Sequence, residues 1–240
     1  MPRRKKRSWL GLAARVALVA ALAYIAWEAL TWPRVAALAR SIPESTAFID
    51  RYKAEQRAAG KNGTADWRWV PYPAISSHLK RAVLVSEDIN FFAHHGFETA
   101  EIETSLNDAL DKRAMPRGAS TISQQVAKNL WLSPSRNPVR KIKEAILTWQ
   151  LERSLDKKRI LEIYLNVAEF GPGIYGAEAA SQRYFGKSAA ELDENEAAQL
   201  AACLPNPRLW NPRGHSAVAA RRTNRILGRM EKAVFLWKEI

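Results

Sequence analysis

Acids, imidazoles and aromatic side chains are concentrated between Glu87 and Gly96, directly after an apolar run with helical periodicity. That run, from Ile75 to Val83, predicts a helix that ends near Glu87. The macrodipole of a helix favours cations at this end, so the adjacent carboxylates of Glu87 and Asp88 are mildly unfavourable there. The pair is therefore either a solvated acidic helix end or a site where a carboxylate acts as a general acid or base.

A second block combines hydroxyls, amides and a cation between residues 117 and 129. Ser120 or Thr121 is suited to cap a helix that begins here. The helix carries Gln124, Gln125 and Lys128 on neighbouring turns. Hydroxyls and amides form neutral hydrogen bonds with a polyhydroxylated ligand, and a lysine attracts an anion. The block predicts either a face that binds sugar and phosphate or an ordinary capped surface helix.

A third block, Arg140–Glu144, opens a further predicted helix. Arg140 and Glu144 are four residues apart, so they lie together on one side of it. The apolar residues predict that the opposite side faces the core, and the charged residues then either form a weak solvent-facing ion pair or line a cleft. These apolar residues are Ile142, Ala145, Ile146 and Trp149.

The beginning of the chain has the composition of a membrane anchor. A basic cluster from Arg3 to Arg7 lies in a tail that we assign to residues 1–9. The apolar run at residues 10–32 is long enough to span a bilayer and is flanked by tryptophans. The basic cluster predicts a cytoplasmic N-terminus, with the rest of the chain beyond the membrane. A signal peptide cleaved after the segment 21–23 is the alternative.

The rest of the chain predicts one mostly helical domain, because strand signals are scarce. With 47% hydrophobic residues among 240, a sizeable core can form. We assign residues 33–68 to a connector and residues 69–240 to the domain. Cys203 is the only cysteine, which excludes an intramolecular disulfide. The net charge of +13 indicates either an anionic partner, such as lipid headgroups or a phosphorylated lipid, or a generally basic surface.

Several blocks match one family in order along the chain. Between Trp69 and Pro212 the sequence resembles the monofunctional biosynthetic peptidoglycan transglycosylases, which are related to the glycosyltransferase domain of bifunctional penicillin-binding proteins. Motifs matched together in register are highly specific, whereas any one of them would be weak evidence. The matching positions are Glu87, Asp88, Phe91, His94 and Gly96; Gly118, Ser120, Thr121, Gln124, Gln125, Lys128 and Asn129; Arg140, Lys141 and Glu144; Ile160, Leu161, Glu162, Tyr164, Leu165 and Asn166; and Tyr184 to Lys187.

The resemblance implies a lysozyme-like helical fold and inverting transfer that polymerises lipid II into glycan strands, with release of undecaprenyl pyrophosphate. Glu87 would be the general base and Glu144 a second catalytic acid whose role the sequence does not define. Lys128 and Arg140 would stabilise charge on the leaving pyrophosphate. No cofactor and no metal ligand are implied, and assistance by a divalent cation is left open. The residues expected to bind substrate are Asp88, Phe91, His94, Ser120, Thr121, Gln124, Gln125, Lys128, Asn129, Arg140 and Lys141.

The expected partners are lipid II, the nascent glycan strand, membrane lipids and proteins of cell-wall synthesis or division. Nucleic acid is not expected, because no nucleic-acid-binding motif is recognisable. The implied location is the bacterial inner membrane, with the catalytic domain in the periplasm. Two alternatives remain: a lytic transglycosylase on a similar fold, and an inert membrane-anchored scaffold. Lys128 and Arg140 argue against cleavage of an uncharged bond, and the intact acids Glu87 and Glu144 argue against the scaffold.

Overall fold

The computed structural model divides the chain into two compact units, Met1–Arg34 and Val35–Ile240. The second unit contains every sequence motif that was matched above. Gly118 of the second motif lies outside the residues whose structure is described. The described residues are 4–98, 120–135, 138–214 and 216–240.

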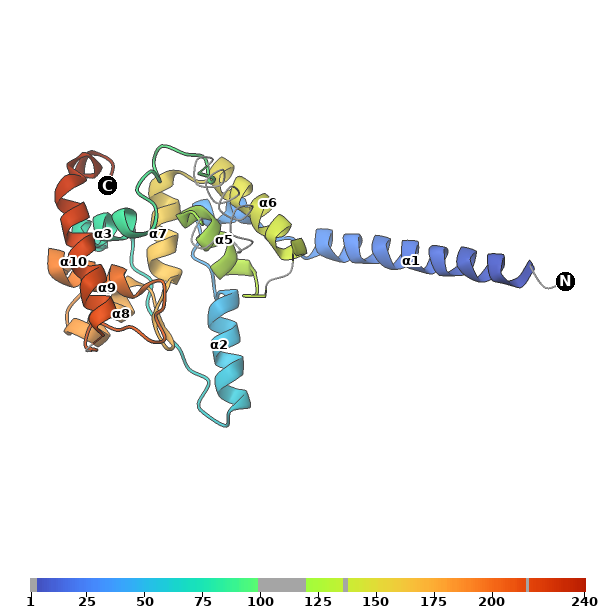
Figure 1. Ribbon diagram of the computed structural model, residues 1–240, viewed down its shortest axis with the longest axis horizontal. Coiled ribbons are helices and arrows are strands. Elements are labelled where there is room, and N and C mark those ends of the chain that lie inside the picture. The colour runs from blue at the N-terminus through green and yellow to red at the C-terminus, as the bar shows by residue number, and fades with distance from the viewer. Residues whose placement is uncertain (1–3, 99–119, 136–137, 215) are drawn as a thin grey trace. The chain divides into compact units, whose positions relative to one another are not determined.

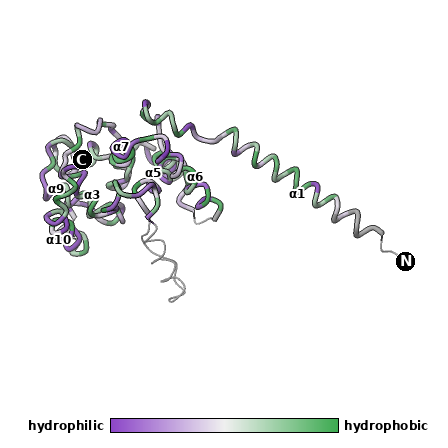
Figure 2. Tube along the Cα trace, turned by 90° about the horizontal axis from the view of Figure 1, so that it is seen from above, coloured by the Kyte–Doolittle hydropathy of each residue, from purple (hydrophilic) through white to green (hydrophobic). Residues whose placement is uncertain are grey.

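The first unit contains one long helix, α1 (Arg4–Leu30), whose described side chains are almost all exposed. Hydrophobic residues follow one another along much of this helix (Figure 2). In the described part of the chain, α1 is the helix that is long and apolar enough to cross a membrane, judged by length and composition. It covers most of the predicted segment 10–32 and indicates a single-pass membrane anchor.

The second unit is mostly helical, and one group of its helices is built around α5 (Ile122–Trp131). This helix packs against both α6 (Pro138–Ser154) and α7 (Lys157–Val167). Two segments from earlier in the chain complete the group: α2 (Ala47–Ala58) packs on α5, and the short helix η1 (Val35–Ala39) packs on α6. The group brings the second and third sequence motifs into one packed layer.

The other group lies across α7 from α5 and α6 (Figure 1). Here α9 (Glu194–Cys203) packs against both α3 (Ser77–Glu87) and α10 (Ala217–Lys232). α3 and α10 also contact each other, so the C-terminal helix lies beside the helix that carries Glu87. Among the described residues, the remaining helical segments are η2 (Tyr72–Ala74), α8 (Ala177–Phe185), η3 (Ala189–Glu191) and η4 (Val234–Lys238).

Residues 33–68, predicted to be a connector, form part of the second unit from Val35 onward. Val35 and Leu38 are buried, and Ile49 of α2 has no exposed surface. Thr46 caps α2, because its hydroxyl oxygen accepts a hydrogen bond from the amide of Ile49 at 3.1 Å. These buried apolar residues belong to η1 and α2, which pack on α6 and α5.

A small three-stranded sheet joins the early part of the chain to its middle. β1 (Asp66–Trp67) runs parallel to β3 (Ile174–Tyr175), and β2 (Glu169–Gly171) pairs antiparallel with β3. The hairpin turns at Gly173, whose φ of 75° is accessible to glycine at little cost. The indole of Trp67 donates to the backbone oxygen of Asn166 at 2.7 Å, which fixes β1 to the end of α7.

α3 positions the first motif, because most of its residues are buried against neighbouring helices. The hydroxyl oxygen of Ser76 caps its start by accepting from the amide of His78 at 3.2 Å. Leu79, Val83 and their neighbours are buried, and burial of each such side chain contributes about 1.5–3 kcal/mol. The helix ends at Glu87, as the sequence predicted, because Asp88 leaves the helical conformation with φ −165° and ψ 79°.

Candidate active site

Glu87 is held at the end of α3 by contacts to both carboxylate oxygens. Its Oε2 accepts from the side-chain amide of Gln125 at 3.2 Å. Its Oε1 accepts from the hydroxyl of its neighbour Ser86 at 3.1 Å and from the guanidinium of Arg222 at 3.2 Å. The side chain is 13% exposed, so it is oriented by protein groups yet reachable from solvent. These are the conditions under which a carboxylate can act as a positioned base.

Asp88 differs from its neighbour in its surroundings, because its side chain is buried and both carboxylate oxygens accept hydrogen bonds. Its two oxygens contact Nε2 of His94 at 3.0 and 3.1 Å, and Oδ2 also accepts from the amide of Ile122 at 2.9 Å. The imidazole Nδ1 in turn accepts from the amide of Gly96 at 3.0 Å, which places the proton of the neutral ring on Nε2. Asp88 and His94 therefore tie the loop after α3 to the start of α5.

Of the two predicted caps of α5, Ser120 and Thr121, the structure selects Thr121, which forms a complete capping box with Gln124. The hydroxyl oxygen of Thr121 accepts from the Gln124 amide at 3.2 Å, while the Gln124 side chain accepts from the Thr121 amide at 3.0 Å. The Thr121 hydroxyl also donates to the backbone oxygen of Gly96 at 2.7 Å. Both side chains are buried. We therefore assign Thr121 and Gln124 to the positioning of α5 rather than to direct substrate contact.

Gln125 links the Glu87 carboxylate to the core. Its amide oxygen accepts from the hydroxyl of the buried Tyr164 at 3.1 Å, and its amide nitrogen also lies 3.4 Å from the backbone oxygen of Ser120. Burial, and to a smaller extent the carboxylates of Glu87 and Asp88, raise the pKa of Tyr164 well above its ordinary value of 10.0. The tyrosine hydroxyl therefore stays protonated and fixes which end of the Gln125 amide faces Glu87.

The third motif forms an ion cluster around a buried carboxylate at the start of α6. Glu144 is 3% exposed, accepts from the Arg140 guanidinium at 2.7 Å and pairs with the ammonium of Lys141. Arg140 also donates to the backbone oxygen of Ser135 at 2.5 Å. The interpretation of this pair as solvent-facing is therefore wrong, because its carboxylate faces the interior.

The prediction that Ile142, Ile146 and Trp149 form the core-facing side of α6 is also wrong. Ile142, Ile146 and Trp149 are 63%, 43% and 54% exposed, whereas Leu147 and Leu151 have no exposed surface. Both sides of this helix carry apolar residues, and the one that contains Glu144 is buried against α5.

Lys128 lies on α5, close enough to both acids for their charges to act on its ammonium group. Burial lowers its pKa from the ordinary 10.5, as do the charges of Arg140 and Lys141, while the carboxylates of Glu144 and Glu87 raise it. Both acids therefore act on this one ammonium group. The site combines a positioned carboxylate with a cluster of cations, an arrangement suited to deprotonating a nucleophile while stabilising an anionic leaving group.

Two other predicted contact residues lie away from solvent. Phe91 has no exposed surface, packs edge to face with Phe92, and lies under the ammonium of Lys157 at 4.4 Å from its ring centre. We assign Phe91 to the core of the loop that follows α3. Asn129 is 8% exposed, so at most a small part of its side chain reaches a ligand.

Asp88, His94 and Glu98 place potential ligand atoms within 4.8 Å of one another. The carboxylate of Asp88 is already used by His94 and by the amide of Ile122, while Glu98 accepts from the Asn90 side chain at 3.0 Å. These hydrogen bonds account for the cluster, so we do not assign a metal to it.

A known protein family matches the part of the chain that contains these site residues. The family model described as Transglycosylase matches residues 53–231, which include both acids, the cation cluster and Arg222. The chain belongs to the transglycosylase family.

Several relatives of this transglycosylase are named "Biosynthetic peptidoglycan transglycosylase". The protein from Azoarcus sp. is 42% identical over 97% of this chain and 96% of its own length. The proteins from Thiobacillus denitrificans and Janthinobacterium sp. are 44% and 45% identical, over 86% and 80% of this chain and 88% and 83% of their own lengths. The expectation of a mostly α, lysozyme-like domain with one N-terminal apolar helix is confirmed.

Arg222 also belongs to the site of this transglycosylase, although no pattern in the sequence points to it. It contacts Glu87 from α10, 135 residues further along the chain, and also donates to the Ser86 hydroxyl at 3.1 Å. No local motif marks it, because one arginine in a basic amphipathic helix has no distinguishing neighbours. Only the packing of α10 on α3 brings it to the site.

Proposed function

We propose that this transglycosylase polymerises lipid II into glycan strands by inverting glycosyl transfer, with release of undecaprenyl pyrophosphate. One observation carries the proposal: α5 connects a positioned carboxylate to a cation cluster. Gln125 holds Glu87, and Lys128, one turn further along, lies in the field of Glu144. Synthesis from a lipid pyrophosphate needs both groups, whereas cleavage of an uncharged glycosidic bond does not need the cations.

In the proposed reaction Glu87 removes the proton from the C4 hydroxyl of the acceptor sugar. The hydroxyl oxygen forms a bond to the anomeric carbon of the donor sugar as the bond to the lipid pyrophosphate breaks, and the configuration at that carbon inverts. The proton ends on the Glu87 carboxylate. A base positioned in this way contributes about 10²–10⁴-fold to the rate.

The cation cluster acts at the other end of the breaking bond. Lys128, Arg140 and Lys141 stabilise the negative charge that develops on the pyrophosphate. Glu144 holds Arg140 and Lys141 in place from the buried side and raises the pKa of Lys128. In this proposal Glu144 organises the cations and does not exchange a proton with substrate.

The proposed location is the inner membrane of a bacterium, with the N-terminus cytoplasmic and the catalytic unit in the periplasm. The basic cluster at the N-terminal end of α1 supports this orientation. Lipid II, the nascent glycan strand and membrane lipids are the proposed partners, with cell-wall synthesis or division proteins beside them. The mechanism is supplied by side chains and invokes no cofactor; titration with Mg²⁺ tests whether a divalent cation assists.

The test is glycan formation from labelled lipid II by the full chain in detergent, with products resolved by gel electrophoresis. Synthesis predicts long glycan and a matching release of undecaprenyl pyrophosphate. Preformed glycan is incubated in parallel. If the protein shortens that glycan and forms none from lipid II, it is a lytic enzyme; if it does neither while folded, the scaffold interpretation is correct.

Activity should fall at alkaline pH through Lys128. Because its pKa is lowered, chiefly by burial, the ammonium loses its proton below the ordinary 10.5 as the pH rises. The stabilisation of the leaving group is lost with that proton. We therefore expect kcat to fall at a pH below the ordinary pKa of a lysine side chain. Lys128→Arg should shift this fall to higher pH, because a guanidinium stays charged.

The matched control is Lys61→Arg, at an exposed lysine after α2, which should leave the pH profile of kcat unchanged. An identical alkaline limb in wild type and Lys128→Arg would show that Lys128 does not control it.

A further inference from the structure

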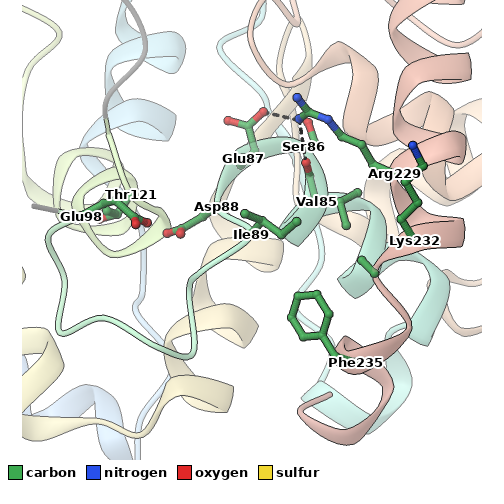
Figure 3. A pocket seen from close by; sticks show the side chains of 11 residues that line it. Val85, Ser86, Glu87, Asp88, Ile89, Glu98, Thr121, Arg229, Lys232 and Phe235 are labelled. Carbon is green, nitrogen blue, oxygen red and sulfur yellow. Dashed lines mark hydrogen bonds between the residues drawn. The ribbon is translucent and has the colours of Figure 1, made fainter. Parts of the chain in front are cut away.

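A cavity of about 340 Å³ lies where α6 is followed by α7, and the proposed reaction does not use it. We call it the α6–α7 cavity. Its volume falls in the range of pockets that hold small ligands, which is about 300–1,000 Å³. It shares no described lining residue with the pocket beside Glu87 (Figure 3), so it lies outside the candidate active site. The lining residues used below are Ala39, Tyr72, Asp156, Lys158, Arg159 and Glu162.

The hydroxyl of Tyr72 is a buried hydrogen-bond donor without an acceptor among the described residues. Burial, and to a smaller extent the charge of Asp156, raise the pKa of Tyr72 from 10.0 to about 12, so the hydroxyl keeps its proton at neutral pH. An unpaired buried donor is unfavourable, and such groups in folded proteins usually have a partner. Because Tyr72 lines the cavity, an acceptor bound there can supply the missing partner.

Two ammonium groups near Tyr72 have no carboxylate partner among the described residues. Lys80 is 4% exposed, and its Nζ lies 3.9 Å from the centre of the Tyr72 ring. Lys158 lines the cavity and is itself exposed. Burial lowers the pKa of Lys80 from the ordinary 10.5, and the charge of Lys158 lowers it further. Two cations that repel each other in this way favour an anion beside them.

The two acids of the cavity are engaged by Arg159 and do not neutralise these lysines. Oε1 of Glu162 pairs with the Arg159 guanidinium at 2.5 Å. Oδ1 of Asp156 accepts from the backbone amide of Arg159 at 2.7 Å, as the cap at the start of α7. The donors left for a ligand are therefore the Tyr72 hydroxyl and the Lys158 ammonium. Phosphate offers several acceptor oxygens for such donors, and lysine is a common phosphate ligand.

The cavity also borders the segment that follows the membrane anchor. Ala39 of η1 lines it, and only residues 31–34 separate η1 from α1 in the sequence. The Arg159 guanidinium fixes this segment by donating to the backbone oxygens of Leu38 at 2.8 Å and Ser41 at 2.7 Å. A lipid headgroup is therefore one source of the phosphate, and a soluble phosphate compound is the other.

We propose that the α6–α7 cavity binds a phosphate group. The phosphate accepts a hydrogen bond from the Tyr72 hydroxyl and pairs with the Lys158 ammonium, and the charge of Lys80 adds to the attraction. The bound group joins η2 and α7 beside the segment that leads from the anchor. This inference does not depend on the glycosyl transfer proposed above.

The test measures the unfolding temperature of the full chain in detergent, because a ligand that binds the folded protein raises it. One series contains inorganic phosphate at constant ionic strength. The other contains mixed micelles with phosphatidylglycerol, and micelles with diacylglycerol, which lacks the phosphate, are the lipid control. At a ligand concentration ten times Kd the wild type should unfold about 2–4 °C higher than without ligand.

Three variants separate binding from stability. Tyr72→Phe removes the unpaired donor, so without ligand it should unfold at or above the wild-type temperature. With ligand, both Tyr72→Phe and Lys158→Gln should lose at least half of the wild-type shift. Lys61→Gln, at an exposed lysine outside the cavity, is the matched control and should keep the full shift.

The ligand series identify the source of the phosphate. A shift at lower concentrations of phosphatidylglycerol than of inorganic phosphate indicates a lipid headgroup, and the reverse order indicates a soluble compound. The inference is wrong if neither ligand shifts the wild type, or if diacylglycerol alone reproduces the shift. It is also wrong if Tyr72→Phe and Lys158→Gln keep the full shift, because binding then occurs elsewhere on the basic surface.

Discussion

Glu87→Gln should reduce glycan formation about 10²–10⁴-fold while the protein stays folded. Glutamine has nearly the same shape, so it can keep a hydrogen bond to Gln125 or Ser86, but its amide cannot take the proton of the acceptor hydroxyl. The guanidinium of Arg222 loses its charged partner, and at 28% exposure of its side chain it can be solvated instead. The expected loss is therefore in kcat rather than in KM for lipid II.

The measurement is the initial rate of polymerisation of labelled lipid II, with thermal unfolding of the same samples as the check on folding. Glu231→Gln is the matched control, because it removes an exposed carboxylate from α10 without touching the site. A folded Glu87→Gln protein that keeps more than about a tenth of the wild-type rate would show that another group is the base.

Local patterns in the sequence predicted the parts of the site that local physics determines. The end of α3 at Glu87 followed from helical spacing, and a cap at Ser120 or Thr121, of which the structure uses Thr121, followed from residue type. Both depend on interactions within a few residues along the chain. The capping partner Gln124 was assigned to substrate because a buried cap and an exposed polar face have the same sequence pattern.

The sequence of α6 allows either of two apolar sides to face the core, and Glu144 is buried only if the side that carries it does so. One side of the helix carries Ile142, Ile146 and Trp149, and the other carries Leu147 and Leu151. The sequence favoured the first side as the core-facing side, because the charged residues Arg140 and Glu144 lie on the opposite side. Packing against α5 selects the second, because Arg140 and Lys141 compensate the buried carboxylate.

The contribution of α10 to the site was beyond local prediction for a different reason. Arg222 lies far from Glu87 along the chain and belongs to no recognised motif. Its contact with Glu87 depends on the packing of α3, α9 and α10, which no spacing rule encodes. The structure thus adds to the predicted base an arginine that contacts the same carboxylate.

Glu144→Gln should lower the rate of polymerisation about 10²-fold, and the loss should grow as the pH rises. The substitution removes the buried charge that holds Arg140 and Lys141 in place. It also removes the largest upward influence on the pKa of Lys128, which burial has already lowered. The pKa of Lys128 then falls further, so a smaller fraction of this lysine is charged at any given alkaline pH. The wild type and the variant are compared by kcat between pH 6 and pH 9.

A structural effect alone would not produce that pH dependence. Glu162→Gln is the matched control, because it breaks a similarly shielded pair with Arg159 at 2.5 Å on α7, away from the site. It should lower the unfolding temperature to a similar degree but leave the pH profile of kcat unchanged.

Adding Lys128→Arg to Glu144→Gln should restore part of the activity at alkaline pH, since the guanidinium keeps its charge without Glu144. Restoration would mean that Glu144 acts through the charge of Lys128. A loss that is equal at every pH and insensitive to Lys128→Arg would mean that Glu144 acts on substrate directly.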